Sequence, residues 1–304
     1  MENSNTSAGS RPEEGALFDA AFLDRTSRLR LAITKKSSLS YQGRRRSTLR
    51  GSSAEFSDYR EYLPGDDVRR IDWNVYARLD RPYIREYMEE RESAVNLFLD
   101  LTSSMGLLDK DLLAKRLAGA LAVISLNNLD RVGLHIISGG RVESFRFPGG
   151  KNQIRRALSL IEKARCSGAG NLPAAVRSVP YLASGMSILI SDFCEESFLQ
   201  GGQQLCRYLA YRKQEIIFLQ ILSGEELSPA DSGTFEMIDS EGTYDPVNIG
   251  LDEKTISAYD AELKKFLLEV KKIADGAGAR YFLCNADEPY DKVLFSKLRD
   301  IYDR

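Results

Sequence analysis

From residue 94 onward, this chain alternates short apolar runs with amphipathic stretches, and that alternation limits the folds open to it. Strand patterns, most of them rich in apolar residues, lie at residues 94–100, 131–138, 141–147, 186–192, 215–222 and 280–284. Helical patterns lie between or after them, at residues 109–127, 151–163, 172–181, 196–211, 254–274 and 290–302. Strands that alternate with helices form parallel sheets. We therefore predict an α/β fold, a doubly wound and mostly parallel sheet with helices on both faces.

Oxygen-bearing side chains follow the first predicted strand directly. That strand ends in Asp100, hydroxyls follow at Thr102 and Ser104, and a later strand ends in Asp192. Ligands of open α/β sheets bind at the carboxyl ends of the strands, so Asp100 and Asp192 should lie side by side if both strands are central. Carboxylates and hydroxyls are ligands that Mg²⁺ accepts. The pattern predicts a metal site; the alternative is that the two hydroxyls only cap the next helix.

The spacing Asp-x-Thr-x-Ser after a buried strand, with a later Ser-Asp, resembles the metal-ion-dependent adhesion site of von Willebrand factor A domains. The matching positions are Asp100, Thr102, Ser104 and Asp192. The resemblance implies a von Willebrand factor A-like domain over residues 93–304 with a bound Mg²⁺. A further threonine ligand of that family corresponds to Gly170, which supplies no side-chain oxygen.

A second resemblance lies in residues 55–78, which read EFSDYREYLPGDDVRRIDWNVYAR. They resemble the diagnostic segment E-F-x-D-x-R-x-Y-x-P-G-D-D-x-R-x-I-D-W-x-x-x-A-R of the bacterial domain of unknown function 58 family. In that family the segment precedes a von Willebrand factor A-like domain, and members are typically encoded beside MoxR-type AAA+ ATPases. The resemblance implies a short soluble member that acts as an adaptor or co-chaperone of such an ATPase.

Residues 55–78 also have a physical interpretation of their own. The sequence Pro64-Gly65-Asp66-Asp67 predicts a turn, because proline presets φ and glycine supplies a positive φ. Acids and arginines alternate around it, and arginine pairs well with carboxylates, so we expect a fixed ion-pair network that Trp73 anchors on the domain. The residues predicted to bind a partner are Arg60, Asp66, Asp67, Arg69, Arg70, Asp72, Trp73 and Arg78.

This charged segment has two compatible roles. It can fasten an N-terminal extension to the sheet domain, or it can present a docking surface to a partner. A catalytic centre built from its acids is a third interpretation, which the arginines disfavour because they lower the pKa values of paired carboxyls.

Composition excludes several classes of protein. The formal net charge is -2, and no apolar run is long enough to span a membrane. The chain has one histidine, His135, so sites that need two histidines are excluded, and its four scattered cysteines form neither a zinc pattern nor a disulfide framework.

We expect a cytoplasmic protein. We interpret the basic residues within 35–50 as a solvated or acid-paired loop, and we expect no nucleic-acid partner.

The predicted organisation has three parts: a disordered tail at residues 1–15, a helical and arginine- and acid-rich module at 16–92, and the sheet domain at 93–304. Residues 234–249 are expected to form a hairpin outside the sheet. The predicted function is a non-enzymatic protein-binding adaptor. The alternatives are a metal-assisted hydrolase that uses Asp100 and Asp192, and an anion-binding module that uses the basic segment.

Overall fold

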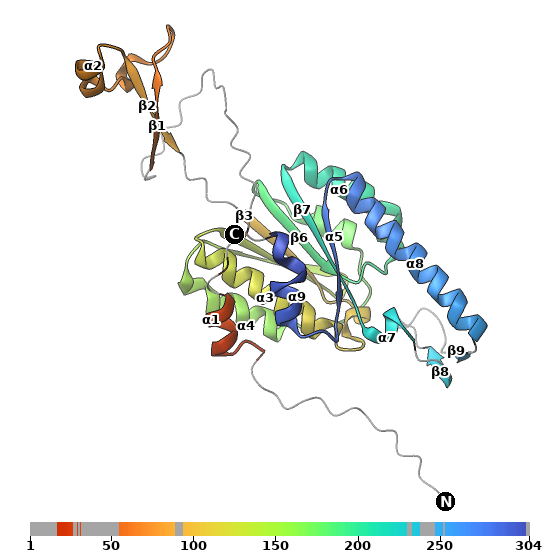
Figure 1. Cartoon of the computed structure of the whole chain (residues 1–304). Coiled ribbons are helices and arrows are strands. Elements are labelled where there is room, and N and C mark those ends of the chain that lie inside the picture. Colours follow the sequence, from red (N-terminus) through yellow and green to blue (C-terminus); the bar gives the residue numbers. More distant parts are fainter. Residues whose placement is uncertain are drawn as a thin grey trace, which may run out of the picture. The chain divides into compact units, whose positions relative to one another are not determined.

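The computed structural model describes residues 17–26, 29, 31, 55–88, 94–229, 233–237, 247–251 and 253–301. The chain divides into two compact units (Figure 1). The larger unit comprises residues 1–34 and 93–304, and the smaller unit comprises residues 35–92. The predicted tail at residues 1–15 and the basic segment at 35–50 lie outside the described residues.

A six-stranded sheet forms the centre of the larger unit, with the strand order β10-β7-β6-β3-β4-β5. Only the pairing of β4 with β5 is antiparallel; the other four pairings are parallel. The mixed α/β architecture and the mostly parallel sheet are therefore confirmed. The strands are β3 (Ala94–Asp100), β4 (Arg131–Ser138), β5 (Arg141–Phe147), β6 (Gly185–Ser191), β7 (Gln214–Leu222) and β10 (Arg280–Asn285).

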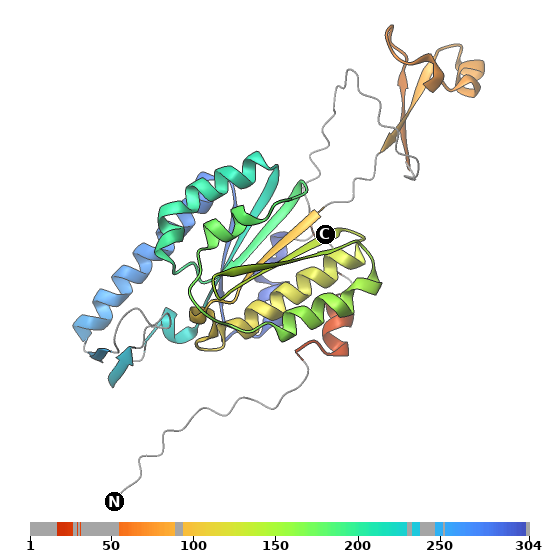
Figure 2. The same ribbon diagram turned by 180° about the vertical axis from the view of Figure 1, so that it is seen from behind.

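Helices cover both faces of this sheet (Figures 1 and 2). Side chains alternate along β3, so Leu97 and Leu99 enter one core while Phe98 enters the other. The first face carries α1 (Ala20–Thr26), α3 (Lys110–Asn127), α4 (Ile154–Lys163) and α9 (Tyr290–Phe295). The second face carries α5 (Leu172–Ser178), α6 (Glu196–Tyr211) and α8 (Glu253–Gly276).

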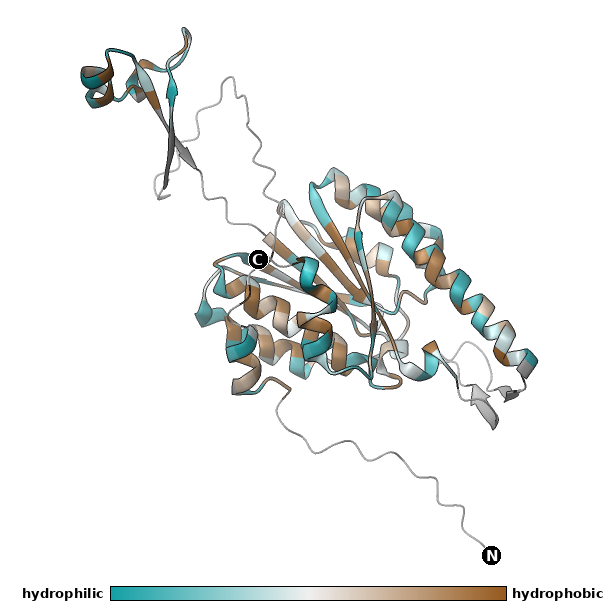
Figure 3. Ribbon diagram, in the orientation of Figure 1, coloured by the Kyte–Doolittle hydropathy of each residue, from teal (hydrophilic) through white to brown (hydrophobic). Residues whose placement is uncertain are grey.

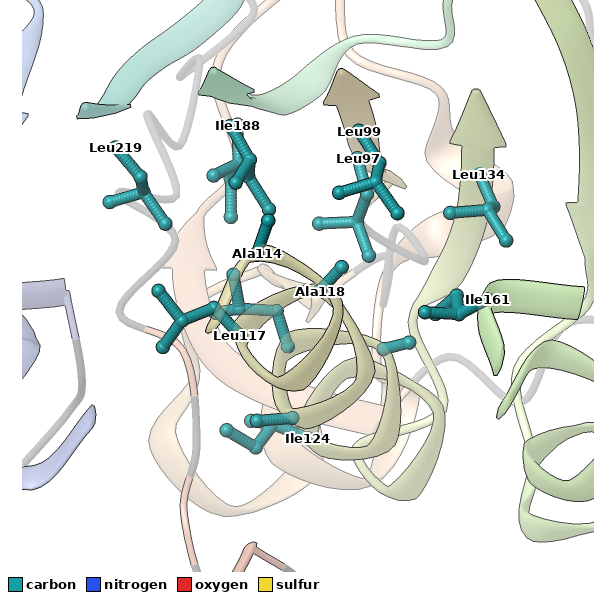
Figure 4. Packing of buried hydrophobic residues seen from close by; sticks show 14 of the residues in the cluster. Leu97, Leu99, Ala114, Leu117, Ala118, Ile124, Leu134, Ile161, Ile188 and Leu219 are labelled. Atoms are coloured by element: carbon teal, nitrogen blue, oxygen red, sulfur yellow. The ribbon is translucent and has the colours of Figure 1, made fainter. Parts of the chain in front are cut away.

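Helix α3 is the centre of the first core. In Figure 4, Ala114 lies below Ile188, Ala118 lies below Leu97 and Leu99, and Leu117 lies on the side of Leu219. Figure 3 shows the same division by hydropathy, with brown residues on the central strands and teal residues on the outer turns of the helices. A helix this deeply buried brings its first residues close to the carboxyl ends of the strands.

Short helical segments complete the larger unit. They are η2 (Ser103–Gly106), η3 (Lys151–Gln153), α7 (Gly224–Leu227) and η4 (Lys297–Ile301). The pattern at residues 290–302 predicted one helix, but the chain forms α9 and then η4. Strands β8 (Gly233–Met237) and β9 (Val247–Leu251) pair antiparallel in a sheet of their own, as expected for residues 234–249, and the residues between them lie outside the description.

The division of the chain differs from the expected module at residues 16–92. Helix α1 belongs to the larger unit, where Phe22 is 2% exposed. A Cβ added to Gly119 of α3 would lie 2.2 Å from the ring of Phe18, so this glycine lets the residues around α1 approach α3 closely. No helix in the described part of the chain is long and apolar enough to cross a membrane.

The smaller unit is built on an antiparallel pair, β1 (Glu55–Glu61) and β2 (Tyr83–Met88). Between these strands lie η1 (Val68–Arg70) and α2 (Trp73–Leu79). The predicted turn at Pro64-Gly65 is present, and Gly65 has a φ of 108°, which favours glycine.

His135 of β4 is the one histidine of the chain and it is 1% exposed. Its ring stacks on Phe98 with centroids 4.6 Å apart, and its Nδ1 lies 2.8 Å from the Ser144 hydroxyl. Nε2 is buried and has no hydrogen-bond partner in the described structure, which fits a neutral ring that carries its proton on Nδ1. Burial, and then the charge of Arg146, lowers the pKa of His135 from 6.5 to about 4.

We predict that this histidine makes the fold less stable in acid. Between pH 6.5 and about 4 the unfolded chain binds a proton on His135 that the native chain does not, so stability falls as pH falls. The loss attributable to His135 reaches about 3 kcal/mol at the lower end. The single imidazole signal in a proton NMR titration gives the native pKa directly. The variant His135→Gln should lose this contribution to the pH dependence, and a native pKa near 6.5 would contradict the prediction.

Candidate functional site

The carboxyl ends of β3 and β6 bring the predicted site residues together. The two strands are parallel neighbours, with Leu99 opposite Ile190, so Asp100 lies beside the end of β6. The Ser191 hydroxyl donates a hydrogen bond of 2.6 Å to Asp100 Oδ2, and Asp192 follows at the next position. The expected juxtaposition of Asp100 and Asp192 is present, and their role as ligands stays a prediction.

Asp100 is completely buried. Its Oδ1 accepts a 3.0 Å hydrogen bond from the Thr102 backbone N–H, so each of its two oxygens has a donor within the protein. Burial, and then the charge of Asp192, raises the pKa of Asp100 from 3.8 to about 7, although the Ser191 hydrogen bond acts in the opposite direction. The carboxyl therefore takes up a proton near neutral pH.

The two predicted hydroxyl ligands contact each other. Thr102 Oγ1 and Ser104 Oγ are 3.2 Å apart, and Thr102 is 1% exposed. Thr102 occupies the N-cap position of η2, but its side chain makes no capping hydrogen bond there. The capping alternative for this hydroxyl is therefore wrong, and Thr102 holds its hydroxyl beside that of Ser104.

Asp192 faces a buried lysine that the sequence patterns did not indicate. Lys110 Nζ donates hydrogen bonds of 2.9 Å to Asp192 Oδ2 and 2.7 Å to Glu226 Oε1. Lys110 and Asp192 are each 1% exposed. Burial alone would lower the pKa of Lys110, but the charges and hydrogen bonds of Asp192 and Glu226 outweigh burial and raise that pKa. The ammonium therefore keeps its charge in the interior.

The space beside Gly170 contains a carboxylate. A Cβ added to Gly170 would lie 2.5 Å from Glu195 Oε1 and 2.5 Å from Thr102 Cγ2, so no larger residue fits without rearrangement. Glu195 Oε2 accepts hydrogen bonds from the Leu172 N–H at 2.9 Å and the Ser197 hydroxyl at 2.8 Å. Glu195 thus lies next to Thr102, where the resemblance places a threonine hydroxyl. The neighbouring Asn171 instead caps α5 through the Ala174 N–H.

Mg²⁺ at this edge would have to lie beside charges that are already present. A cation shared by Asp100 and Asp192 would need a lone pair from each carboxylate and would lie next to any cation already paired with them. Asp192 Oδ2 is bound by the Lys110 ammonium, and Asp192 Oδ1 accepts a 3.1 Å hydrogen bond from the Cys194 N–H. Within the residues that the structure describes, no group of three or more His, Cys, Asp or Glu side chains is placed to hold a metal. In this geometry the residues do not fit a shared cation.

The acids of the smaller unit hold the backbone. Asp72 Oδ1 accepts hydrogen bonds from the Asn74 and Val75 N–H groups, and Asp72 Oδ2 accepts one from the Tyr59 hydroxyl. Asp67 caps η1 through the Arg69 N–H. Asp66 accepts from the Leu63 N–H and pairs with Arg60 at 3.0 Å.

The arginines and aromatics of the smaller unit are arranged differently from the expected network. Arg69 and Arg78 are exposed and form no ion pair in the described structure, and the side chain of Arg70 lies outside the description. Trp73 is 62% exposed, and its expected role as an anchor on the sheet domain stays a prediction. It contacts Tyr76 edge to face, with centroids 6.0 Å apart.

Comparison with known proteins places the chain among uncharacterized relatives. The family model described as "Protein of unknown function DUF58" matches residues 58–265. Uncharacterized proteins of Mycobacterium bovis and of two Mycobacterium tuberculosis strains are 27% identical to it over 200 residues. The match covers 63% of this chain and 62% of each relative, so the chain spans less than two thirds of their length.

Two solved structures show a weaker likeness. The pilus adhesin SpaC from Lactobacillus rhamnosus GG aligns with a TM-score of 0.45 and 12% identity, over 70% of this chain and 30% of the adhesin. An uncharacterized membrane spanning protein from Vibrio fischeri aligns with a TM-score of 0.21 and 14% identity, over 69% and 98% of the two chains. Likenesses at this level carry no argument about function.

We predict that Asp100→Asn gains stability over the wild type as pH rises. Between about pH 4 and 7 the native wild type holds a proton on Asp100 that the unfolded chain releases, so wild-type stability falls through this window. Asparagine has no such titration, and the difference should grow by up to about 4 kcal/mol. Urea unfolding in EDTA at pH 5 and pH 8 should show about 3 kcal/mol of this change. A difference that stays constant between the two pH values would show that Asp100 is ionised throughout.

Proposed function

This chain belongs to the DUF58 family, and we propose that it is a non-enzymatic adaptor or co-chaperone that binds a MoxR-type AAA+ ATPase. The choice of partner follows from the family resemblance of residues 55–78. The choice of binding over catalysis follows from the side chains of the two units. The smaller unit presents apolar groups to solvent, whereas the acids at the sheet edge are buried and already hydrogen-bonded.

The observation that carries the proposal is the α2 face, which we define as Trp73, Tyr76 and Leu79. These side chains are 62%, 40% and 59% exposed, and α2 has no buried residue. They recur every three positions, so they are neighbours on the helix surface. Exposed clusters of this kind mark interaction sites, and tryptophan and tyrosine dominate the binding energy of such sites.

The charges beside the α2 face indicate the kind of surface that it would meet. Arg69 and Arg78 are exposed near its two ends, and neither pairs with an acid of the described structure. Arginine is enriched with tryptophan and tyrosine among the residues that contribute most to interfaces. The matching surface of the ATPase would therefore combine an apolar pocket with carboxylates. Leu63 and Val68, which are 56% and 55% exposed, extend the apolar area of the same unit.

A metal-assisted hydrolase is the second candidate. The observation in its favour is the pKa of Asp100 near 7, which suits a group that transfers protons at neutral pH. Against it, Asp100 and Asp192 are at most 1% exposed, so a substrate could not reach them without movement of the surrounding loops. A screen of ester and phosphoester substrates with Mg²⁺ and Mn²⁺ tests this candidate. Activity that Asp192→Asn abolishes would favour the hydrolase over the adaptor.

We predict that Trp73→Ala combined with Tyr76→Ala weakens binding of the MoxR-type ATPase of the same organism by at least about 30-fold. Both side chains are exposed, so the fold should be retained, which circular dichroism and thermal unfolding would verify. The matched control is Tyr211→Ala, because Tyr211 is 85% exposed on α6 of the larger unit. Titration calorimetry measures the three affinities. Equal affinity for the double variant and the wild type would refute the α2 face as the docking site.

A further inference from the structure

A lysine ammonium lies at the sheet edge where the family resemblance places a metal ion. Lys110 Nζ is 2.9 Å from Asp192 Oδ2 and 2.7 Å from Glu226 Oε1. Lysine is almost never fully buried unless it is paired, and here the residue is 1% exposed. The pairing therefore explains how a cation is kept in the interior, and it makes Lys110 part of the site.

The ammonium joins three connections that meet at this edge. Lys110 is the first residue of α3, Asp192 follows β6, and Glu226 lies in α7, which follows β7. A divalent cation at the carboxyl ends of parallel strands would also contact the segments that follow those strands. Here the Lys110 ammonium makes these contacts, and its charge belongs to the chain itself.

Glu226 is oriented for this contact by its own helix. Ser223 and Glu226 form a capping box, in which Glu226 Oε2 accepts the Ser223 N–H at 2.7 Å and the Ser223 hydroxyl at 3.1 Å. These bonds leave Oε1 to accept from Lys110. The carboxylate is thus held toward the ammonium before any ligand arrives, as expected for a preformed site.

The same geometry opposes a metal ion at Asp192. A cation that bridged Asp100 and Asp192 would have to share the Asp192 carboxylate with the Lys110 ammonium, which is 2.9 Å from it. The metal ion and the ammonium would then be two positive charges close together in a buried site, where they repel strongly. The hydrogen bonds of Asp100 to Thr102 and Ser191 already hold that carboxyl in place.

We propose that Lys110 is the built-in cation of this site, that it takes the place of Mg²⁺, and that the site needs no divalent metal. A partner protein that reaches this edge would then find no metal ion that could accept its acidic side chain as a ligand. Binding of a partner at this edge would therefore be unaffected by EDTA. The inference concerns the larger unit and holds whether or not the smaller unit binds an ATPase.

The test uses the full chain, first treated with EDTA and then dialysed. Calorimetric titration of the wild type with Mg²⁺ and with Mn²⁺ should give no saturable heat, and its Tm should be the same in EDTA and in excess MgCl₂. Saturable binding that Asp100→Asn abolishes would overturn the proposal.

Two lysine variants test the role of the ammonium itself. Lys110→Met should lower the Tm much more than Lys115→Met, because the first leaves the buried carboxylate of Asp192 without a counter-charge. Lys115 is a matched control: it lies on the same helix, is 7% exposed and pairs with Asp111 at 2.8 Å. Equal Tm values for the two variants would overturn the proposal.

If Lys110→Met alone does not fold, the double variant with Asp192→Asn decides the question. Removing the uncompensated carboxylate should restore folded, soluble protein, and failure to restore it would count against a charge-balancing role.

Discussion

The burial of β3 on both faces is the constraint on which the rest of the larger unit depends. All seven of its residues are buried, between β4 on one side and β6 on the other. Leu97 and Leu99 require the α3 layer on one face, and Phe98 requires the α6 layer on the other. The strand ends in a carboxyl, so Asp100 remains inside the protein. Its burial is what obliges Ser191 and the Thr102 backbone to supply donors.

The elements around β3 could be predicted because each is encoded locally. Strand patterns bounded by polar residues located the six strands, and Asp100 was expected beside Asp192 on the condition that both strands are central. The sheet order meets that condition, because β3 and β6 are neighbours. The partners of these acids could not be predicted in the same way. Lys110 follows an aspartate at the start of a helix, where a lysine normally reaches solvent, and only the closeness of α3 to the sheet makes it buried. A signal for Glu226 did exist, since Ser223 lies three residues before it at capping-box spacing.

The acids of the smaller unit bind backbone groups as well as arginines, which charge alternation alone did not predict. Asp67 and Asp72 bind backbone N–H groups, because they are the N-cap residues of η1 and α2 and the first N–H groups of a helical segment have no acceptor within it. Asp66 does both, because it accepts the Leu63 N–H and also pairs with Arg60. Arg69 and Arg78 form no ion pair in the described structure, and Trp73 is 62% exposed.

A fixed ammonium and a bound metal ion differ in what they allow a site to do. A metal ion can leave, and it can accept a further ligand from outside, so its site responds to concentration and to partners. An ammonium on Lys110 donates in fixed directions and cannot dissociate. Buried ion pairs of this kind add little net stability, because desolvation offsets most of the attraction, but breaking one partner is costly. The pair between Lys110 and Asp192 therefore favours one arrangement of three connections at the sheet edge, and our proposal is that this arrangement persists whatever divalent ions are present.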